Sequence, residues 1–161
     1  MATTATNKQP LLIDRVFHNV VEGNGLTSGS ASSLDILGTN QSVVLVDCTS
    51  NDGGIVEDLY AIARTGSSTA YTVLFYLATA TDYLRPSEGI YIASIESDTT
   101  AGSKVKAVLP SILAPVPRVG SDAQAQALYV PKGKVLWATL QLVTSNGTAD
   151  TPIIGAQGGF Y

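Results

Sequence analysis

From residue 43 onward, the sequence is a succession of short apolar segments separated by clusters of Gly, Ser, Asn, Asp and Pro. Residues 43–46, for example, read Val-Val-Leu-Val, and the turn cluster Thr-Ser-Asn-Asp-Gly-Gly follows at 49–54. The segments have the length of strands and recur about every 8–15 residues, a spacing typical of sandwiches and barrels. The pattern therefore predicts an all-β fold, a single β-sandwich or jelly roll of about eight strands.

Two stretches predict antiparallel strands joined by short turns. Residues 55–64 and 70–78 are β-prone and are separated by Thr-Gly-Ser-Ser-Thr at 65–69, which is the pattern of a β-hairpin. Both alternating faces of residues 70–78 are largely apolar, so we expect this strand to be buried on both sides. Residues 126–130 and 135–144 flank Pro-Lys-Gly-Lys, whose Pro and Gly favour a turn.

Further strands are expected at 89–95 and 105–109, and a last one at 151–161 follows the Asn-Gly pair at 146–147. Residues 56–63 also have the composition of a short helix with acidic residues at its start. We favour a strand there, because flanking glycines bound this segment at strand length.

The region 1–42 differs in composition from the rest of the chain. Residues 1–10 are polar and Thr-rich, residues 11–21 are apolar and β-prone, and residues 22–42 are rich in Gly, Ser, Thr and Asn. The last of these stretches has too few large apolar groups to fold by itself. We therefore expect an extended N-terminal arm at 1–42 and a β-sandwich domain at 43–161. The alternative is that residues 11–21 form an extra strand of the same sheet.

Charged residues make up only 14% of the chain, against roughly 25% in average soluble domains, whereas apolar residues make up 45%. The net charge is −4 and the basic residues are scattered, so nucleic-acid binding is not expected. The apolar runs are far shorter than the roughly 20 residues that span a bilayer, and no signal peptide precedes them. The apolar excess is therefore expected inside the fold or in contacts between proteins.

Candidate catalytic and metal-binding residues are scarce. A single His and a single Cys exclude a zinc cluster, an intrachain disulfide and a His-His metal pair. His18 is expected to be a structural or interface residue, and Cys48 a buried thiol. Asp47, Asn51 and Asp52 resemble calcium ligands, but with Asp47 at position 1 the loop has Asp where an EF-hand needs Gly. We expect a solvated turn there, and no enzyme activity, cofactor or metal.

Residues 55–78 and the segment Ala-Leu-Tyr-Val-Pro-Lys-Gly-Lys-Val-Leu-Trp-Ala at 127–138 resemble the small jelly-roll structural proteins of tailed bacteriophage virions. The resemblance implies a capsid decoration or cement protein, made in the host cytoplasm and placed on the capsid surface. Its implied partners are the major capsid protein and further copies of itself, as a homotrimer. In such proteins terminal arms often reach over neighbouring subunits, and residues 1–42 would be such an arm.

The expected contact residues are the apolar residues of the arm and the two aromatic residues that end the sequence. They are Leu11, Leu12, Ile13, Val16, Phe17, Phe160 and Tyr161. Burial of these residues between subunits would also account for the low charge, because interface cores are depleted in charged residues.

Two alternatives keep the same fold. One is a head-tail connector or tail structural protein. The other is a carbohydrate-binding jelly roll, such as a receptor-binding module, which needs exposed aromatic rings beside polar planar groups. Trp137, Tyr83 and Tyr91 are the candidates for those rings.

Overall fold

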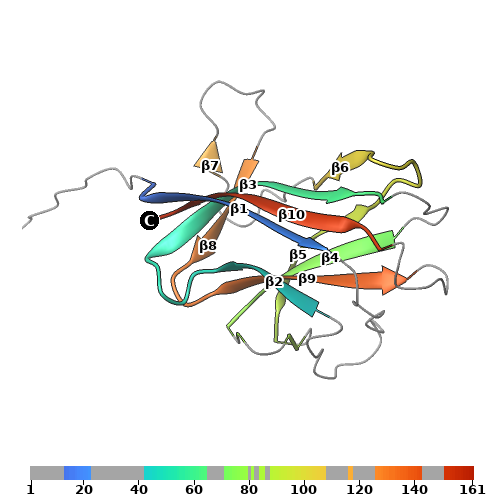
Figure 1. The fold of residues 1–161 in the computed structure, drawn as a ribbon. Coiled ribbons are helices and arrows are strands. Elements are labelled where there is room, and N and C mark those ends of the chain that lie inside the picture. The colour runs from blue at the N-terminus through green and yellow to red at the C-terminus, as the bar shows by residue number, and fades with distance from the viewer. Residues whose placement is uncertain are drawn as a thin grey trace, which may run out of the picture.

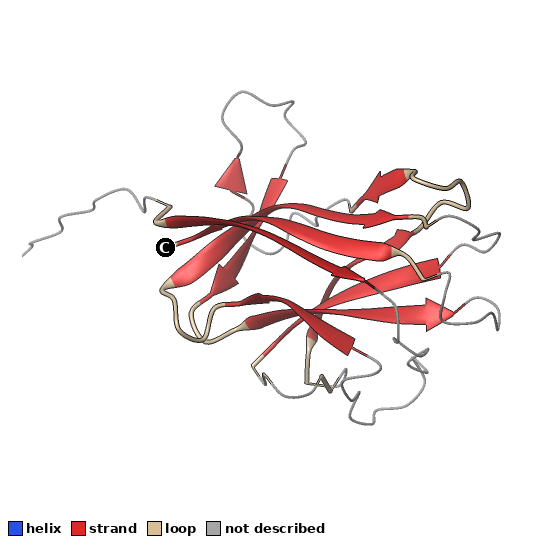
Figure 2. Ribbon diagram, in the orientation of Figure 1, coloured by secondary structure: helices blue, strands red, loops and turns tan. Residues whose placement is uncertain are grey.

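The computed structural model describes residues 13–22, 42–64, 71–79, 81, 84–85, 88–107, 116–117, 126–142 and 151–161. All regular structure in these ranges is β-strand (Figure 2). In chain order the strands are β1 (Arg15–Glu22), β2 (Ser42–Asp47), β3 (Gly53–Ile62), β4 (Tyr71–Ala78), β5 (Ile90–Glu96), β6 (Lys104–Lys106), β7 (Val116–Pro117), β8 (Gln126–Pro131), β9 (Val135–Leu142) and β10 (Ile153–Phe160). Strand structure over Gly53–Ile62 confirms the choice of strand over helix.

The strands form two antiparallel sheets packed face to face (Figure 1). The first sheet has the order β1-β10-β3-β8-β7, with β6 also paired to β3, and the second has the order β2-β9-β4-β5. The eight longer strands have the order β1-β10-β3-β8 in one sheet and β2-β9-β4-β5 in the other, which is the strand order of a jelly roll. The predicted fold class, an all-β sandwich of about eight strands, is thereby confirmed.

The main core lies between the two sheets. Strand β4 shows why: its alternate residues Tyr71, Val73, Phe75 and Leu77 share one face, and all four are buried in the cluster between the sheets. The outer face of β4 is partly covered, because a second apolar cluster contains Leu84, Trp137, Val135 and Ala78, with Tyr76 and Val44 packed against it. Thr72, Leu74 and Tyr76 on this face are half-buried, so the expectation that this strand is buried on both sides is met only in part.

The two predicted hairpins are wrong in their pairing, although their strands exist. β3 and β4 lie in different sheets, and so do β8 and β9. The turn between β8 and β9 is present, with Gly133 at φ +77° and the Lys134 N–H donating to the Pro131 carbonyl at 3.1 Å. A short turn forms a hairpin only if the two strands that it joins pair with each other in one sheet. Here β3 pairs with β10, β8 and β6, and β4 pairs with β9 and β5.

The predicted boundary between arm and domain also needs correction. Arg15–Glu22, inside the expected arm 1–42, is strand β1 and pairs with β10 along its full length. The physical reason is that one face of this segment points into the core. Phe17 is buried there, and the Asn19 side chain donates a hydrogen bond to the Leu45 carbonyl of the opposite sheet at 2.6 Å. The alternative of an extra strand within 11–21 therefore describes this segment better. Residues 1–12 and 23–41 lie outside the described residues.

Candidate functional site

Strand β1 is an edge of the six-stranded sheet, and its two faces differ sharply. Successive strand residues point to opposite faces, so Phe17 lies in the core while Val16, His18 and Val20 point outward. Val16 is 78% exposed and Val20 is 51% exposed, and Ile13, just before the strand, is 45% exposed. These three residues are called the β1 apolar strip below. They lie among the most exposed large apolar side chains of the described chain.

The neighbouring strand β10 is rich in glycine, which lets side chains of β1 and β3 lie across it. A Cβ atom on Gly155 would overlap the ring of Tyr60, and one on Gly159 would overlap the side chain of Ile13. Tyr60 of β3 thus reaches across β10, and its hydroxyl forms a hydrogen bond with His18 Nε2. Because these glycines have no side chains, β1, β10 and β3 share one continuous outer surface that β10 does not interrupt.

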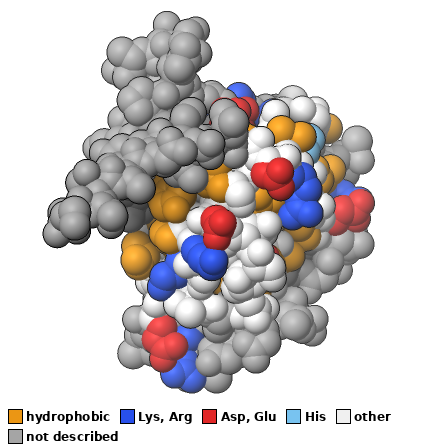
Figure 3. All heavy atoms as spheres, turned by 90° about the vertical axis from the view of Figure 1, so that its left-hand side faces the viewer, with side chains coloured by type: hydrophobic (Ala, Val, Ile, Leu, Met, Phe, Trp, Pro, Cys, Tyr) orange, Lys and Arg blue, Asp and Glu red, His pale blue; other side chains and the backbone are white. Residues whose placement is uncertain are grey.

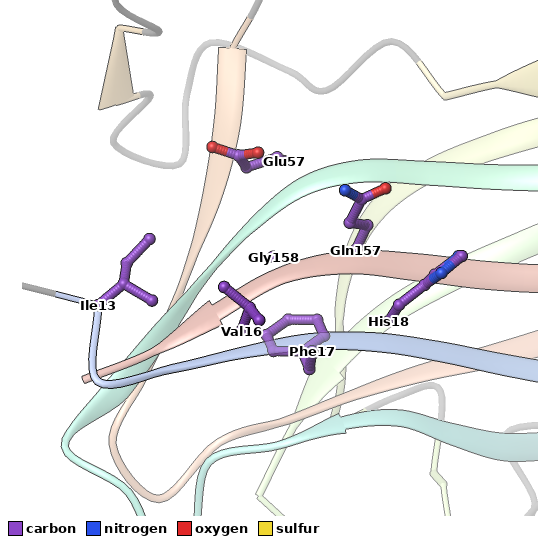
Figure 4. Close-up of a pocket in the computed structure, with 7 residues that line it drawn as sticks. All are labelled: Ile13, Val16, Phe17, His18, Glu57, Gln157 and Gly158. Carbon is purple, nitrogen blue, oxygen red and sulfur yellow. The ribbon is translucent and has the colours of Figure 1, made fainter.

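A shallow cavity of about 240 Å³ lies on this surface beside the β1 apolar strip. Figure 4 shows the residues that line it, which come from β1, β10 and β3 and from Ile13, two residues before β1. They are Ile13, Val16, Phe17, His18, Glu57, Gln157 and Gly158. A mixed, open cavity of this kind suits the side chains of another protein better than the enclosure of a small molecule.

His18 is held in place by its neighbours. Besides the hydrogen bond to Tyr60, the two rings lie 5.9 Å apart between centroids. Lys104 Nζ lies 3.8 Å from the centroid of the Tyr60 ring, a cation–π contact. Burial raises the pKa of Tyr60, and the negative charge of Asp58 adds to the effect. The Tyr60 hydroxyl is therefore neutral at physiological pH, and its hydrogen bond to Nε2 orients the His18 ring.

Two ion pairs lie beside this surface, and acidic and basic side chains also lie close together on the face seen in Figure 3. Lys106 and Asp58 are 2.9 Å apart, and Arg64 and Glu22 are 3.5 Å apart. Exposed pairs of this kind contribute little to stability. Their consequence is that the apolar strip lies in surroundings of nearly zero net charge.

The structure describes five of the seven predicted contact residues and divides these five into three groups. Ile13 and Val16 are exposed, as a contact residue must be. Phe17 and Phe160 are each only 8% exposed and pack together with ring centroids 4.7 Å apart, so their expected role as contact residues is corrected to a role in the core. Tyr161 is partly buried, and its N–H donates to the Gly53 carbonyl at 3.0 Å.

Leu11 and Leu12 lie outside the described residues. Sequence reasoning missed Val20 as a contact residue. The sequence contained the signal for it. Val20 follows Val16 by four positions, an even number, so in a β-strand both side chains lie on the same face.

The other chemical candidates have structural roles. Asp47 accepts hydrogen bonds from the N–H and hydroxyl of Thr49 at 2.8 and 2.6 Å, which makes it a turn residue. No group of three or more His, Cys, Asp or Glu side chains comes together in the described ranges. Burial, with a contribution from Asp47, raises the pKa of the Cys48 thiol to about 11, so this thiol stays protonated at neutral pH.

The aromatic rings that were candidates for stacking on a sugar differ in exposure. Trp137 is 3% exposed and belongs to the second apolar cluster, so it offers no stacking surface. Tyr91 is 51% exposed and meets Tyr76 edge to face, with centroids 5.9 Å apart. Tyr83 lies outside the described residues.

No family model, curated protein or solved structure matches this chain. In the described part of the chain, no helix has the length and apolar character needed to cross a membrane. The function is therefore argued from the surface of β1, β10 and β3.

Proposed function

We propose that the protein is a non-enzymatic structural protein of a tailed-bacteriophage virion, of the decoration or cement type. The observation that carries the proposal is the β1 apolar strip, where Ile13, Val16 and Val20 stand exposed together at the edge of a sheet. Apolar side chains gathered at one place on a surface mark protein contacts. The jelly-roll strand order supports the proposal, because viral capsid domains are among the proteins that use it.

Such a protein works by binding and needs no chemistry. A component that binds the assembled shell, and not its free subunits, stabilises the shell by mass action. Contacts that are weak individually become strong when several copies act together. We propose the major capsid protein as the partner, with the protein itself as a homotrimer on the capsid surface.

The test uses heads of the phage that carries this coding sequence, assembled without the protein. Purified protein is added and the heads are pelleted, with soluble capsid subunits as the comparison. We expect the protein to pellet with heads and to raise the temperature at which they break. Absence of the protein from purified virions, or equal binding to free subunits, would contradict the proposal.

A matched pair of variants links binding to the strip. Val16→Asp places a charge in the strip, whereas Ile90→Asp places one at a 50% exposed position on β5, in the other sheet. We expect Val16→Asp to weaken binding to heads at least tenfold, because an unpaired charge would be buried in the contact. Ile90→Asp should bind like the unmodified protein.

A carbohydrate-binding role is the second candidate, and Tyr91 is the observation that favours it. Its exposed ring could stack on a sugar as aromatic platforms do. Glycan-array binding that is lost in Tyr91→Ala would favour this role over the first. A connector or tail role would instead be indicated if antibodies against the protein label the head-tail junction or the tail of virions.

A further inference from the structure

Strand β1 differs from the other sheet edges in the described structure. Its pairing with β10 runs without a register shift from Arg15 to Glu22. In the second sheet, the edge strands β2 and β5 each contain an extra, unpaired residue, Leu45 and Ile92 respectively. At the far edge of the first sheet, β7 has two residues, one of them Pro117.

Natural sheets protect their edges with bulges, prolines, lysines or short strands, because an open edge recruits other strands. Each of these three edges has such a feature, and so does β6, which pairs with one end of β3 and has only three residues, two of them lysines. β1 is eight residues long, regular, and free of Pro and Lys. Among the described edges, β1 is thus the one suited to pairing.

The side chains of β1 are self-complementary for an antiparallel partner. Val16 and Val20 lie symmetrically about His18 on the outer face, so a reversed copy places Val16 opposite Val20. The two ends of the strand each carry an acidic and a basic residue. Asp14 and Arg15 lie at the start, whereas Glu22 and its partner Arg64 lie at the finish.

We propose that β1 pairs with β1 of a second copy, antiparallel, around a two-fold axis at His18. This register places Asp14 of each copy opposite Glu22 of the other, and Arg64, the ion-pair partner of Glu22, lies beside these two carboxylates. The two six-stranded sheets become one continuous sheet. Main-chain hydrogen bonds supply affinity, and the two Val16–Val20 contacts set the register. A two-fold contact uses the same patch on both copies, so the patch must be self-complementary. The Val16–Val20 symmetry of β1 meets this requirement, and a second copy is therefore the partner.

This contact rests on the edge of β1 and does not depend on the proposed virion role. Its symmetry is two-fold, whereas the expected homotrimer needs a three-fold contact elsewhere. The two contacts together would give an assembly of six chains. A mass of two or six protomers is therefore compatible with β1 pairing, while one or three protomers is not.

The first experiment is light scattering coupled to size-exclusion chromatography on the full chain, over a range of concentrations up to about 100 μM. We expect two or six protomers, and half that mass in Val20→Lys, since an edge lysine opposes pairing. Ile90→Lys, at a similarly exposed position, is the matched control and should keep the mass. A monomer or trimer, or an unchanged mass in Val20→Lys, would overturn the proposal.

The second experiment tests the register and does not depend on Val20→Lys folding. In the proposed pairing His18 lies opposite His18 of the other copy, so His18→Cys in a Cys48→Ala background should form a covalent dimer under mild oxidation. Val16→Cys in the same background should not, because its two thiols would be four residue positions apart on opposite strands. Cross-linking of Val16→Cys in preference to His18→Cys would refute the two-fold axis at His18.

Discussion

The place of β1 in the fold is tested most directly by Phe17→Ala. Phe17 is the residue of β1 that enters the core, where it packs against Phe160 of β10. If residues 15–22 belong to the sandwich, truncation of this ring must leave a cavity between the sheets. If they were a detachable arm, the folded domain would be unaffected.

The size of the effect follows from the burial. Removal of a buried Phe side chain costs about 3–5 kcal/mol. Phe17 lies on an edge strand and keeps 8% of its surface exposed, so the lower end of that range applies. We expect a loss of about 3 kcal/mol, which changes the unfolding equilibrium on the order of a hundredfold. Val16→Ala, on the exposed face of the same strand, should cost less than about 0.5 kcal/mol.

Urea denaturation followed by Trp137 fluorescence measures both variants. Trp137 is the only tryptophan of the chain, and its burial makes its emission sensitive to unfolding. The comparison is made at one low protein concentration, so that self-association contributes equally. Equal stability of Phe17→Ala and Val16→Ala would refute the assignment of β1 to the core.

Three further predictions concern backbone and burial. Gly158→Ala should destabilise the fold by more than about 3 kcal/mol in the same assay, because a Cβ there would overlap the backbone carbonyl of Ile55; stability equal to the parent would contradict the described β10–β3 approach. Asn19→Ala should cost about 1–2 kcal/mol by leaving the Leu45 carbonyl without its donor, and Asn19→Asp should fail to restore the loss. The Cys48 thiol has its pKa raised to about 11 from 9.0, so its contribution to stability is full below pH 9 and is lost as pH rises toward 11. Urea midpoints in that interval should fall less steeply in Cys48→Ala, and parallel slopes would refute the reasoning.

The existence of the strands could be predicted from the sequence because the signal is local. Alternation of Tyr71, Val73, Phe75 and Leu77 with other residues is visible in eight consecutive positions, and it decides which side is buried. Pairing is not local. A Gly-Ser turn after residue 64 is compatible with a hairpin and with a crossing to the other sheet, and the partners available elsewhere in the chain decide between them.

The candidate site was predicted in part for the same reason. An apolar cluster at residues 11–17 indicated a contact region. Whether each of its residues is exposed or buried, however, depends on which face of the strand its side chain lies on. Val16 and Phe17 are neighbours of similar character, yet one is 78% and the other 8% exposed. The role of Phe160 could not be predicted, because it depends on a ring from the opposite end of the chain.

The position of β10 between β1 and β3 has a consequence for synthesis of the protein. During translation β1 is the first of the described strands to leave the ribosome, and its partner β10 is the last of them. Until residues 153–160 emerge, β1 has no neighbour in its sheet, and one side of β3 is open as well. Closing such a distant pair is slow. The nascent chain therefore carries β1, with its apolar residues, unpaired until β10 emerges. We expect chaperones to bind ribosome-stalled chains that end just before β10 more strongly than chains that extend beyond it.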